Sequence, residues 1–142
     1  MALQRIGDAD VGRLLEIVRS WADDRAYVQR AAIAAISEPR LLKTEEAARA
    51  AVDLVDQVTA NLQRMPDRRA DEFRTLRQGL AYCWSVAVSR YPDYGWPRME
   101  RWVASPDPDV RWLLKENLKK SRLVRVDSAR VERLMKLMKE LV

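Results

Sequence analysis

Apolar residues recur every three or four positions along most of the chain, which is the period of amphipathic α-helices. In the segment 105–123 the apolar stripe consists of Val110, Leu113, Leu114 and Leu118. Basic residues four positions apart form another face of the same segment: Arg111, Lys115 and Lys119. Two prolines and two aspartates precede the stripe. They predict a stiff turn and then a helix that starts at about Val110, with Asp107 and Asp109 as capping candidates and Asp109 as the expected cap.

The same periodicity predicts six further helices, whose boundaries follow from prolines and capping residues. Their expected ranges are from 8 or 10 to 21, 25–37, 44–64, 71–90, 97–103, and from 127 or 128 to the C-terminus. Three segments are predicted to be connectors: 67–71, 91–97 and 121–126. The first of these is the most polar and is expected to be the most mobile.

The helix at 71–90 is expected to carry the bulkiest part of the core. Its apolar face consists of Phe73, Leu76, Leu80, Cys83, Trp84 and Ala87, with Tyr82 at the edge. The last helix is expected to turn a second set inward: Val131, Leu134, Met135, Met138 and Leu141. Glycine is scarce and no run alternates like a strand, so the chain is predicted to be one all-α domain spanning residues 1–142.

One local pattern occurs twice along the chain. An acidic turn, a valine, an arginine and an apolar helix follow one another at Val28 and Arg30, and again at Val110 and Arg111. The two valines are 82 residues apart, which is two units of roughly 40 residues, the period of HEAT-type repeats. This pattern predicts a short right-handed α-solenoid of about three helix pairs plus a C-terminal capping helix. A compact bundle of six or seven helices is the alternative.

Two stretches carry a resemblance to a known family. The residues D-P-D-V-R-W-L-L-K-E-N-L-K-K-S-R-L and V-Q-R-A-A-I-A-A-I-S-E-P-R-L-L resemble bacterial HEAT-repeat proteins of the armadillo-like superfamily. That superfamily also contains HEAT-type DNA glycosylases that remove alkylated purines. Their family pattern has an aromatic residue where this chain has Glu116, so no glycosylase residue is carried over. The resemblance implies a helical-repeat fold without specifying an activity.

Composition excludes several kinds of site. The chain contains no histidine, which rules out histidine bases and histidine-ligated metals. Its one cysteine, Cys83, lies among apolar residues and is interpreted as a buried thiol in a reducing, cytoplasmic setting. The dispersed glycines form no phosphate-cradling loop, and no apolar run is long enough to cross a membrane. No cofactor and no membrane partner are therefore expected.

The positive charge is concentrated in the last quarter of the chain. Residues 1–108 carry 16 Lys+Arg and 16 Asp+Glu, whereas residues 109–142 carry ten and five, so the whole net charge of +5 belongs to the last segment. Such a concentration favours an acidic partner, either a protein surface, a phosphate-bearing ligand or nucleic acid. The alternative is that these lysines and arginines are simply the solvated side of amphipathic helices.

Solenoids of this kind commonly bind through the second helix of each pair. Basic residues of the predicted second helices, together with the connector after the last of them, are therefore candidates for one basic groove. These candidates are Arg30, Arg77, Arg111, Lys115, Lys119, Lys120 and Arg122.

Two weaker candidates remain. Trp96, Trp102 and Trp112 would suit a base-stacking platform, although aromatic residues at helical spacing are more often part of a core. Carboxylates between residues 45 and 56 would suit a cation site, although they lack turn-rich ligand loops and more often form a solvated helix face.

The sequence as a whole predicts a non-catalytic binding or scaffold protein that holds a protein or peptide partner in the predicted groove. The alternative is a DNA-binding protein related to the alkylation-repair glycosylases, and an enzymatic role is disfavoured. Residues 1–7 are expected to form an irregular lead-in, and the chain is expected to be a piece of a longer protein. The partner and the oligomeric state are left open by the sequence.

Overall fold

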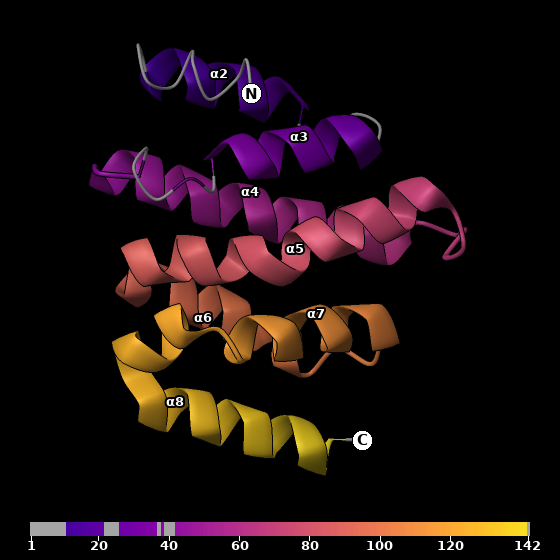
Figure 1. Cartoon of the computed structure of the whole chain (residues 1–142), viewed down its shortest axis with the longest axis vertical. Coiled ribbons are helices and arrows are strands. Elements are labelled where there is room, and N and C mark those ends of the chain that lie inside the picture. The colour runs from indigo at the N-terminus through magenta and orange to yellow at the C-terminus, as the bar shows by residue number, and fades with distance from the viewer. Residues whose placement is uncertain (1–10, 22–25, 37, 39–41, 142) are drawn as a thin grey trace.

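The computed structural model of the chain describes residues 11–21, 26–36, 38 and 42–141 (Figure 1). Within these residues it contains seven helices and no strand, which confirms the all-α prediction. The helices are α2 (Val11–Trp21), α3 (Ala26–Ile36), α4 (Glu45–Arg64), α5 (Asp71–Arg90), α6 (Pro92–Val103), α7 (Pro108–Leu118) and α8 (Ser121–Glu140). None of these seven helices is apolar enough over a sufficient length to cross a membrane.

The helices are arranged in layers along the long axis of the molecule, with α2 at one end and α8 at the other (Figure 1). Each helix packs against the next helix in the chain and also against the one after that. The central helix, α5, packs against α3, α4, α6, α7 and α8. Residues of α5 are therefore held from several directions.

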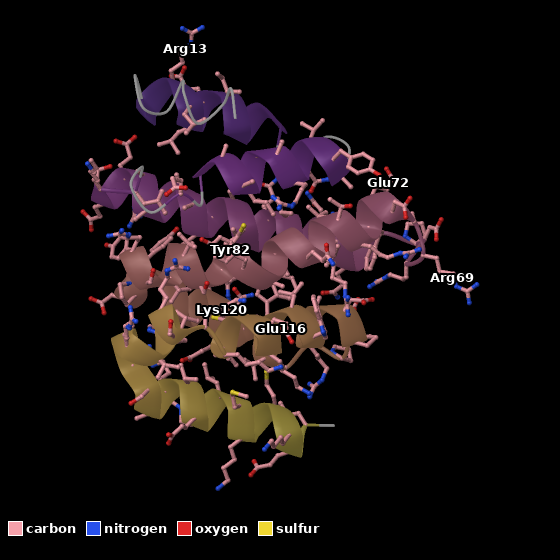
Figure 2. All side chains as sticks on the ribbon, in the orientation of Figure 1. Arg13, Arg69, Glu72, Tyr82, Glu116 and Lys120 are labelled. Carbon is pink, nitrogen blue, oxygen red and sulfur yellow. The ribbon has the colours of Figure 1, made fainter. Side chains whose placement is uncertain are left out.

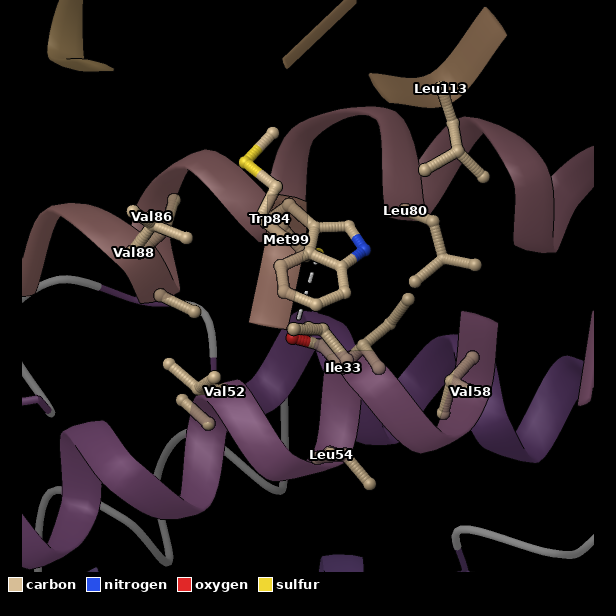
Figure 3. Close-up of a cluster of buried hydrophobic side chains, with 14 of the residues drawn as sticks. Ile33, Val52, Leu54, Val58, Leu80, Trp84, Val86, Val88, Met99 and Leu113 are labelled. Carbon is tan, nitrogen blue, oxygen red and sulfur yellow. Dashed lines mark hydrogen bonds between the residues drawn. The ribbon is translucent and has the colours of Figure 1, made fainter. Parts of the chain in front are cut away.

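Trp84 of α5 lies at the centre of the core, as its helical position predicts. Its side chain is fully buried, and its indole N–H donates a hydrogen bond to the Thr59 hydroxyl of α4 at 2.9 Å. Figure 3 shows it among apolar side chains from several helices, including Ile33, Val52, Val58, Met99 and Leu113. Cys83 is also buried, which confirms its interpretation as an interior thiol.

The two long central helices begin and end close to the predicted residues. Thr44 caps α4, because its hydroxyl accepts the backbone N–H of Ala47 at 3.1 Å. Pro66 follows the end of this helix by two residues, and α5 occupies the predicted range. Leu42, in the turn before α4, is buried against the core.

The prediction of a connector at 91–97 is wrong, because α6 begins at Pro92 and contains Pro97 in its interior. Pro92 occupies the first turn, where its missing N–H is tolerated. The N–H of Gly95 donates to the Tyr91 carbonyl at 2.8 Å and continues the helix. Pro97 is exposed on the outer side, so the helix passes through it with one fewer backbone hydrogen bond. A Cβ at Gly95 would lie 2.9 Å from the Val88 backbone, so glycine permits this close approach to α5.

The cap of α7 is Asp107 rather than the expected Asp109, and the helix starts at Pro108. One oxygen of Asp107 accepts the N–H groups of Asp109 and Val110, at 2.9 and 3.4 Å. Asp109 lies in the first turn, where its carboxylate is 2.8 Å from Arg77 Nε and 3.0 Å from Arg68 Nη1. Asp109 therefore pairs with two arginines instead of capping α7.

Arg68 ties the connector between α4 and α5 to the start of α7. Its guanidinium donates to both oxygens of Asp107, at 3.1 and 2.8 Å, and its Nη1 also donates to Asp109. It further donates to the backbone carbonyls of Met65 and Gln63. The polar segment predicted to be the most mobile is thus held by several hydrogen bonds to its own chain and to α7.

The segment 121–126 is helical, contrary to its prediction as a connector. Asp127 has non-helical angles, φ −160° and ψ 86°, and divides α8 into two helical segments. Its carboxylate accepts the N–H of Arg130 at 3.0 Å, so it caps the second segment, as predicted for Asp127 or Ser128. The inward set of the last helix is confirmed except for Leu141, which is 48% exposed. Leu123 is fully buried and anchors the first segment.

Replacing Asp107 with alanine is expected to lower the free energy of unfolding by about 1 to 2 kcal/mol, because α7 loses its cap. Burial alone would raise the pKa of Asp107, but the hydrogen bonds from Arg68 and from two backbone N–H groups lower it overall. The stability from this ionised group is therefore present above about pH 4, the usual aspartate value, and is lost as the pH falls through the lower folded pKa.

Urea unfolding at neutral and strongly acidic pH measures this effect. Asp107→Asn keeps the capping oxygen but not the charge, so it should lie between wild type and Asp107→Ala at neutral pH. The difference in the free energy of unfolding between wild type and Asp107→Asn should disappear at strongly acidic pH. Asp67→Asn, at an exposed position, is the matched control and should change stability by less than about 0.5 kcal/mol. A gap that persists in acid would contradict the lowered pKa.

Candidate functional site

A surface pocket of about 470 Å³ is formed by residues from the C-terminal half of α5 and from the start of α8. We term it the basic pocket. It is lined by Tyr82, Ser89, Arg90, Lys120, Ser121, Arg122, Arg125 and Val126. Figure 2 shows two of these residues, Tyr82 and Lys120, near each other on the face toward the viewer.

A buried asparagine fixes the part of α5 that carries Tyr82. The amide of Asn117, on α7, accepts the Ser85 N–H at 2.9 Å and donates to the Leu80 carbonyl at 2.9 Å. The Ser85 hydroxyl in turn donates to the Tyr82 carbonyl at 2.7 Å. Because Asn117 is fully buried, these bonds have little competition from water and hold the backbone on both sides of Tyr82.

The other wall of the basic pocket is positioned by the short turn between α7 and α8. The N–H groups of Leu123 and Val124 donate to the Lys120 carbonyl, which starts the new helical segment immediately after α7. The buried Leu123 side chain holds this segment against the core. Its neighbours in the sequence, Arg122 and Arg125, are left at the surface and line the pocket.

The electrostatics of the basic pocket are one-sided. Its lining contains three arginines and one lysine and no carboxylate: Arg90, Lys120, Arg122 and Arg125 provide the charge. Within the described ranges, no aspartate or glutamate forms an ion pair with any of the four. Most other arginines of α5, α6 and α8 and of the α4–α5 connector are paired with carboxylates, namely Arg68, Arg74, Arg77, Arg98, Arg101, Arg130 and Arg133. Like charges gathered without counter-charges produce a positive potential that attracts anions.

Tyr82 joins the basic pocket to a second pocket on the same face. The Arg122 guanidinium lies over the Tyr82 ring, 5.4 Å from its centroid. The second pocket, of about 260 Å³, lies where α3 meets α5, and we term it the mixed pocket because it contains both charges. It is lined by Arg30, Ala34, Glu38, Gln78, Gly79, Tyr82 and Cys83. The Arg30 side chain lies so close over Gly79 that a Cβ there would be 2.5 Å from its Cδ.

The seven residues predicted to form one basic groove do not share a pocket. Lys120 and Arg122 line the basic pocket, and Arg30 lines the mixed pocket beside it. Three others make contacts within the protein: Arg77 with Asp109 and the Trp112 ring, Arg111 with the Met138 carbonyl, and Lys119 with Glu116. Lys115 is half-buried on α7 and lines neither pocket.

The sequence prediction missed Arg90 and Arg125 as members of the site. Arg90 is the last residue of α5, and Arg125 belongs to the segment expected to be a connector. A signal was available, because 121–126 is markedly basic and directly follows Lys119 and Lys120. The sequence does not predict that this segment lies beside the end of α5, because that position depends on how α5, α7 and α8 pack.

The three tryptophans considered for a base-stacking platform are buried or make contacts within the protein. Trp96 is 2% exposed, which leaves no ring surface for a base. Trp102 donates to Asp56 at 2.7 Å, and the Trp112 ring lies 3.7 Å from the Arg77 guanidinium. Three of the carboxylates considered for a cation also have partners, since Asp53 accepts from the Tyr94 hydroxyl, Glu45 from the Tyr91 hydroxyl and Asp56 from the Trp102 indole. Among the residues that the structure describes, no group of three acidic or cysteine side chains could hold a metal ion.

Comparison with known proteins identifies no relative: no family model, no curated protein and no solved structure matches the chain. The resemblance to HEAT-repeat proteins therefore stays an expectation from the residues quoted above. The basic pocket is the feature of this molecule from which a function can be inferred most directly.

Proposed function

We propose that the chain is a non-catalytic helical-repeat module of the HEAT type that holds an acidic segment of a partner protein. In this proposal α2–α3, α4–α5 and α6–α7 are the helix pairs of a short right-handed solenoid, and α8 caps its end. Contacts between the first helices, α2, α4 and α6, and between the second helices, α3, α5 and α7, support this arrangement.

The observation that carries the proposal is the group of four cations without carboxylate partners around the basic pocket. The adjoining mixed pocket shares Tyr82 with the basic pocket, so the two pockets together extend from α8 across α5 to α3. A segment of extended chain could place an acidic residue in the first pocket and a neutral polar residue in the second. Helices carry most of the lining residues of both pockets, so little conformational entropy of the protein would be lost on binding.

Fluorescence anisotropy with a labelled peptide of alternating aspartate and glycine tests this function. The double substitution Arg122→Gln and Arg125→Gln should weaken binding about tenfold, equivalent to about 1.4 kcal/mol. The matched control is Lys136→Gln with Lys139→Gln, which removes the same charge from exposed positions elsewhere on α8 and should leave affinity within about twofold. Equal losses for the two double variants, or no binding by wild type, would contradict the proposal.

DNA binding is the second candidate, favoured by the four cations and by the exposed Tyr82 ring beside them. Duplex DNA needs a basic surface that follows many phosphates. The contacts of Arg77, Arg111 and Lys119 within the protein limit such a surface. A titration with duplex DNA at two salt concentrations separates the candidates. DNA binding that is tighter than peptide binding and falls steeply with salt would overturn the peptide proposal.

A further inference from the structure

We infer that the basic pocket recognises a phosphate monoester, as carried by a phosphorylated serine or threonine of the partner segment. This inference rests on the proposed function and specifies the chemistry of what is bound. It would make the interaction dependent on phosphorylation of the partner.

The charge of the pocket matches a phosphate better than a carboxylate. A phosphate monoester carries about −1.5 to −2 charges at neutral pH and offers three strong acceptor oxygens. A carboxylate carries a single charge and two oxygens, which would leave most of the four cations without a counter-charge. Since no carboxylate lines the pocket, the ligand has to supply the negative charge.

The donors in the pocket have the geometry that phosphate recognition uses. Planar guanidinium groups can form paired hydrogen bonds to two phosphate oxygens, whereas lysine contributes a compact point charge. Arg90 approaches from α5 and Arg122 and Arg125 from α8, so the guanidinium groups reach the pocket from both walls. Ser121 adds an exposed hydroxyl that makes no hydrogen bond to the residues that the structure describes.

The surroundings favour a phosphorylated side chain on a peptide over a nucleic-acid backbone. The volume, about 470 Å³, lies within the usual range of about 300 to 1,000 Å³ for sites that enclose a ligand group. The next pocket along this face contains Glu38 as well as Arg30, so the one-sided charge of the basic pocket does not continue into it. Nucleic acid would instead present diesters of single charge at regular intervals beyond the pocket.

Isothermal titration calorimetry with three peptides tests the inference. The peptides have the sequence Asp-Gly-Asp-Gly-Ser-Gly-Asp-Gly-Asp, with the central serine unmodified, phosphorylated or replaced by glutamate. The phosphorylated peptide should bind about tenfold more tightly than the glutamate peptide. The double substitution Arg122→Gln and Arg125→Gln should abolish this preference, whereas Lys136→Gln with Lys139→Gln should retain it. Circular dichroism melts check that both variants are folded.

The pH dependence of binding distinguishes a phosphorylated peptide from a peptide that is merely acidic. The second phosphate ionisation has a pKa of about 6, so lowering the pH from 7.5 to 5.5 should weaken binding of the phosphorylated peptide roughly fourfold. The chain has no histidine, the side chain whose unperturbed pKa lies in this range. The glutamate peptide should therefore change by much less.

The outcomes separate the two proposals. Equal affinities for the phosphorylated and glutamate peptides would overturn phosphate recognition and leave acidic-peptide binding in place. Absence of binding for all three peptides would overturn both. A preference for the phosphorylated peptide that survives in the Arg122 and Arg125 double variant would overturn the assignment of the recognition to this pocket.

Discussion

Replacing Trp84 with alanine is expected to lower the free energy of unfolding by about 3 to 5 kcal/mol, the usual cost of removing a large aromatic side chain from a core. Trp84 is fully buried where helices from both halves of the chain meet, so the remaining cavity would be lined by several helices at once (Figure 3). The variant also removes the donor that the Thr59 hydroxyl accepts at 2.9 Å. Urea denaturation followed by circular dichroism measures the change.

Two further variants show where the loss comes from. Trp84→Phe keeps most of the ring volume but removes the indole N–H, and its loss should be smaller, about 1 to 2 kcal/mol. Tyr27→Ala removes an aromatic ring that is 54% exposed, and should change stability by less than about 0.5 kcal/mol. If Trp84→Ala were as stable as Tyr27→Ala, the face of α5 that carries Trp84 would not be the face that packs in the core.

Asn117→Ala is expected to destabilise the protein by about 2 to 4 kcal/mol, because it removes hydrogen-bond partners from buried backbone groups. The Asn117 side-chain amide accepts the Ser85 N–H at 2.9 Å and donates to the Leu80 and Leu113 carbonyls at 2.9 and 2.7 Å. Because these bonds hold α5 on both sides of Tyr82, the substitution should also increase amide hydrogen exchange in residues 80–85.

Gln63→Ala provides the control for this prediction. Gln63 has an exposed amide on α4, and its removal should change stability by less than about 0.5 kcal/mol without altering exchange in α5. Asn117→Asp should be at least as harmful as Asn117→Ala, because it places a negative charge beside the Leu80 and Leu113 carbonyls. Wild-type stability for either Asn117 variant would mean that the contact between α5 and α7 does not depend on this amide.

The sequence predicts helices well where local signals set their ends. Thr44 and the proline at 66 delimit α4, and the acidic first turn and apolar period of α5 are also local features. The start of α6 is not predicted correctly, because Pro97 has the pattern of a proline in the first turn of a helix. In the structure the helix begins at Pro92 and continues past Pro97, stabilised by its packing. Asn117 is missed for a similar reason, since its backbone partners on α5 lie more than 30 positions away in the sequence.

The candidate site is predictable only in part. Charge counting directs attention to the C-terminal quarter and includes Lys120 and Arg122, which do line the basic pocket. Helical spacing alone cannot decide whether a basic side chain stays at the surface or pairs within the protein, as Arg77 does with Asp109 and Trp112. Arg90 approaches Lys120 and Arg125 only because α8 turns back beside the end of α5, which local sequence does not determine.

A crystal of the protein soaked in sodium tungstate would test most directly whether the four cations of the basic pocket form a single anion site. Tungstate is a tetrahedral oxyanion like phosphate, and its metal can be located by anomalous scattering. The strongest anomalous peak is expected among Arg90, Lys120, Arg122 and Arg125, with tungstate oxygens within about 3.2 Å of their nitrogen atoms. A well-ordered soaked crystal in which the pocket is empty, while tungstate binds at other exposed arginines or lysines, would contradict the account.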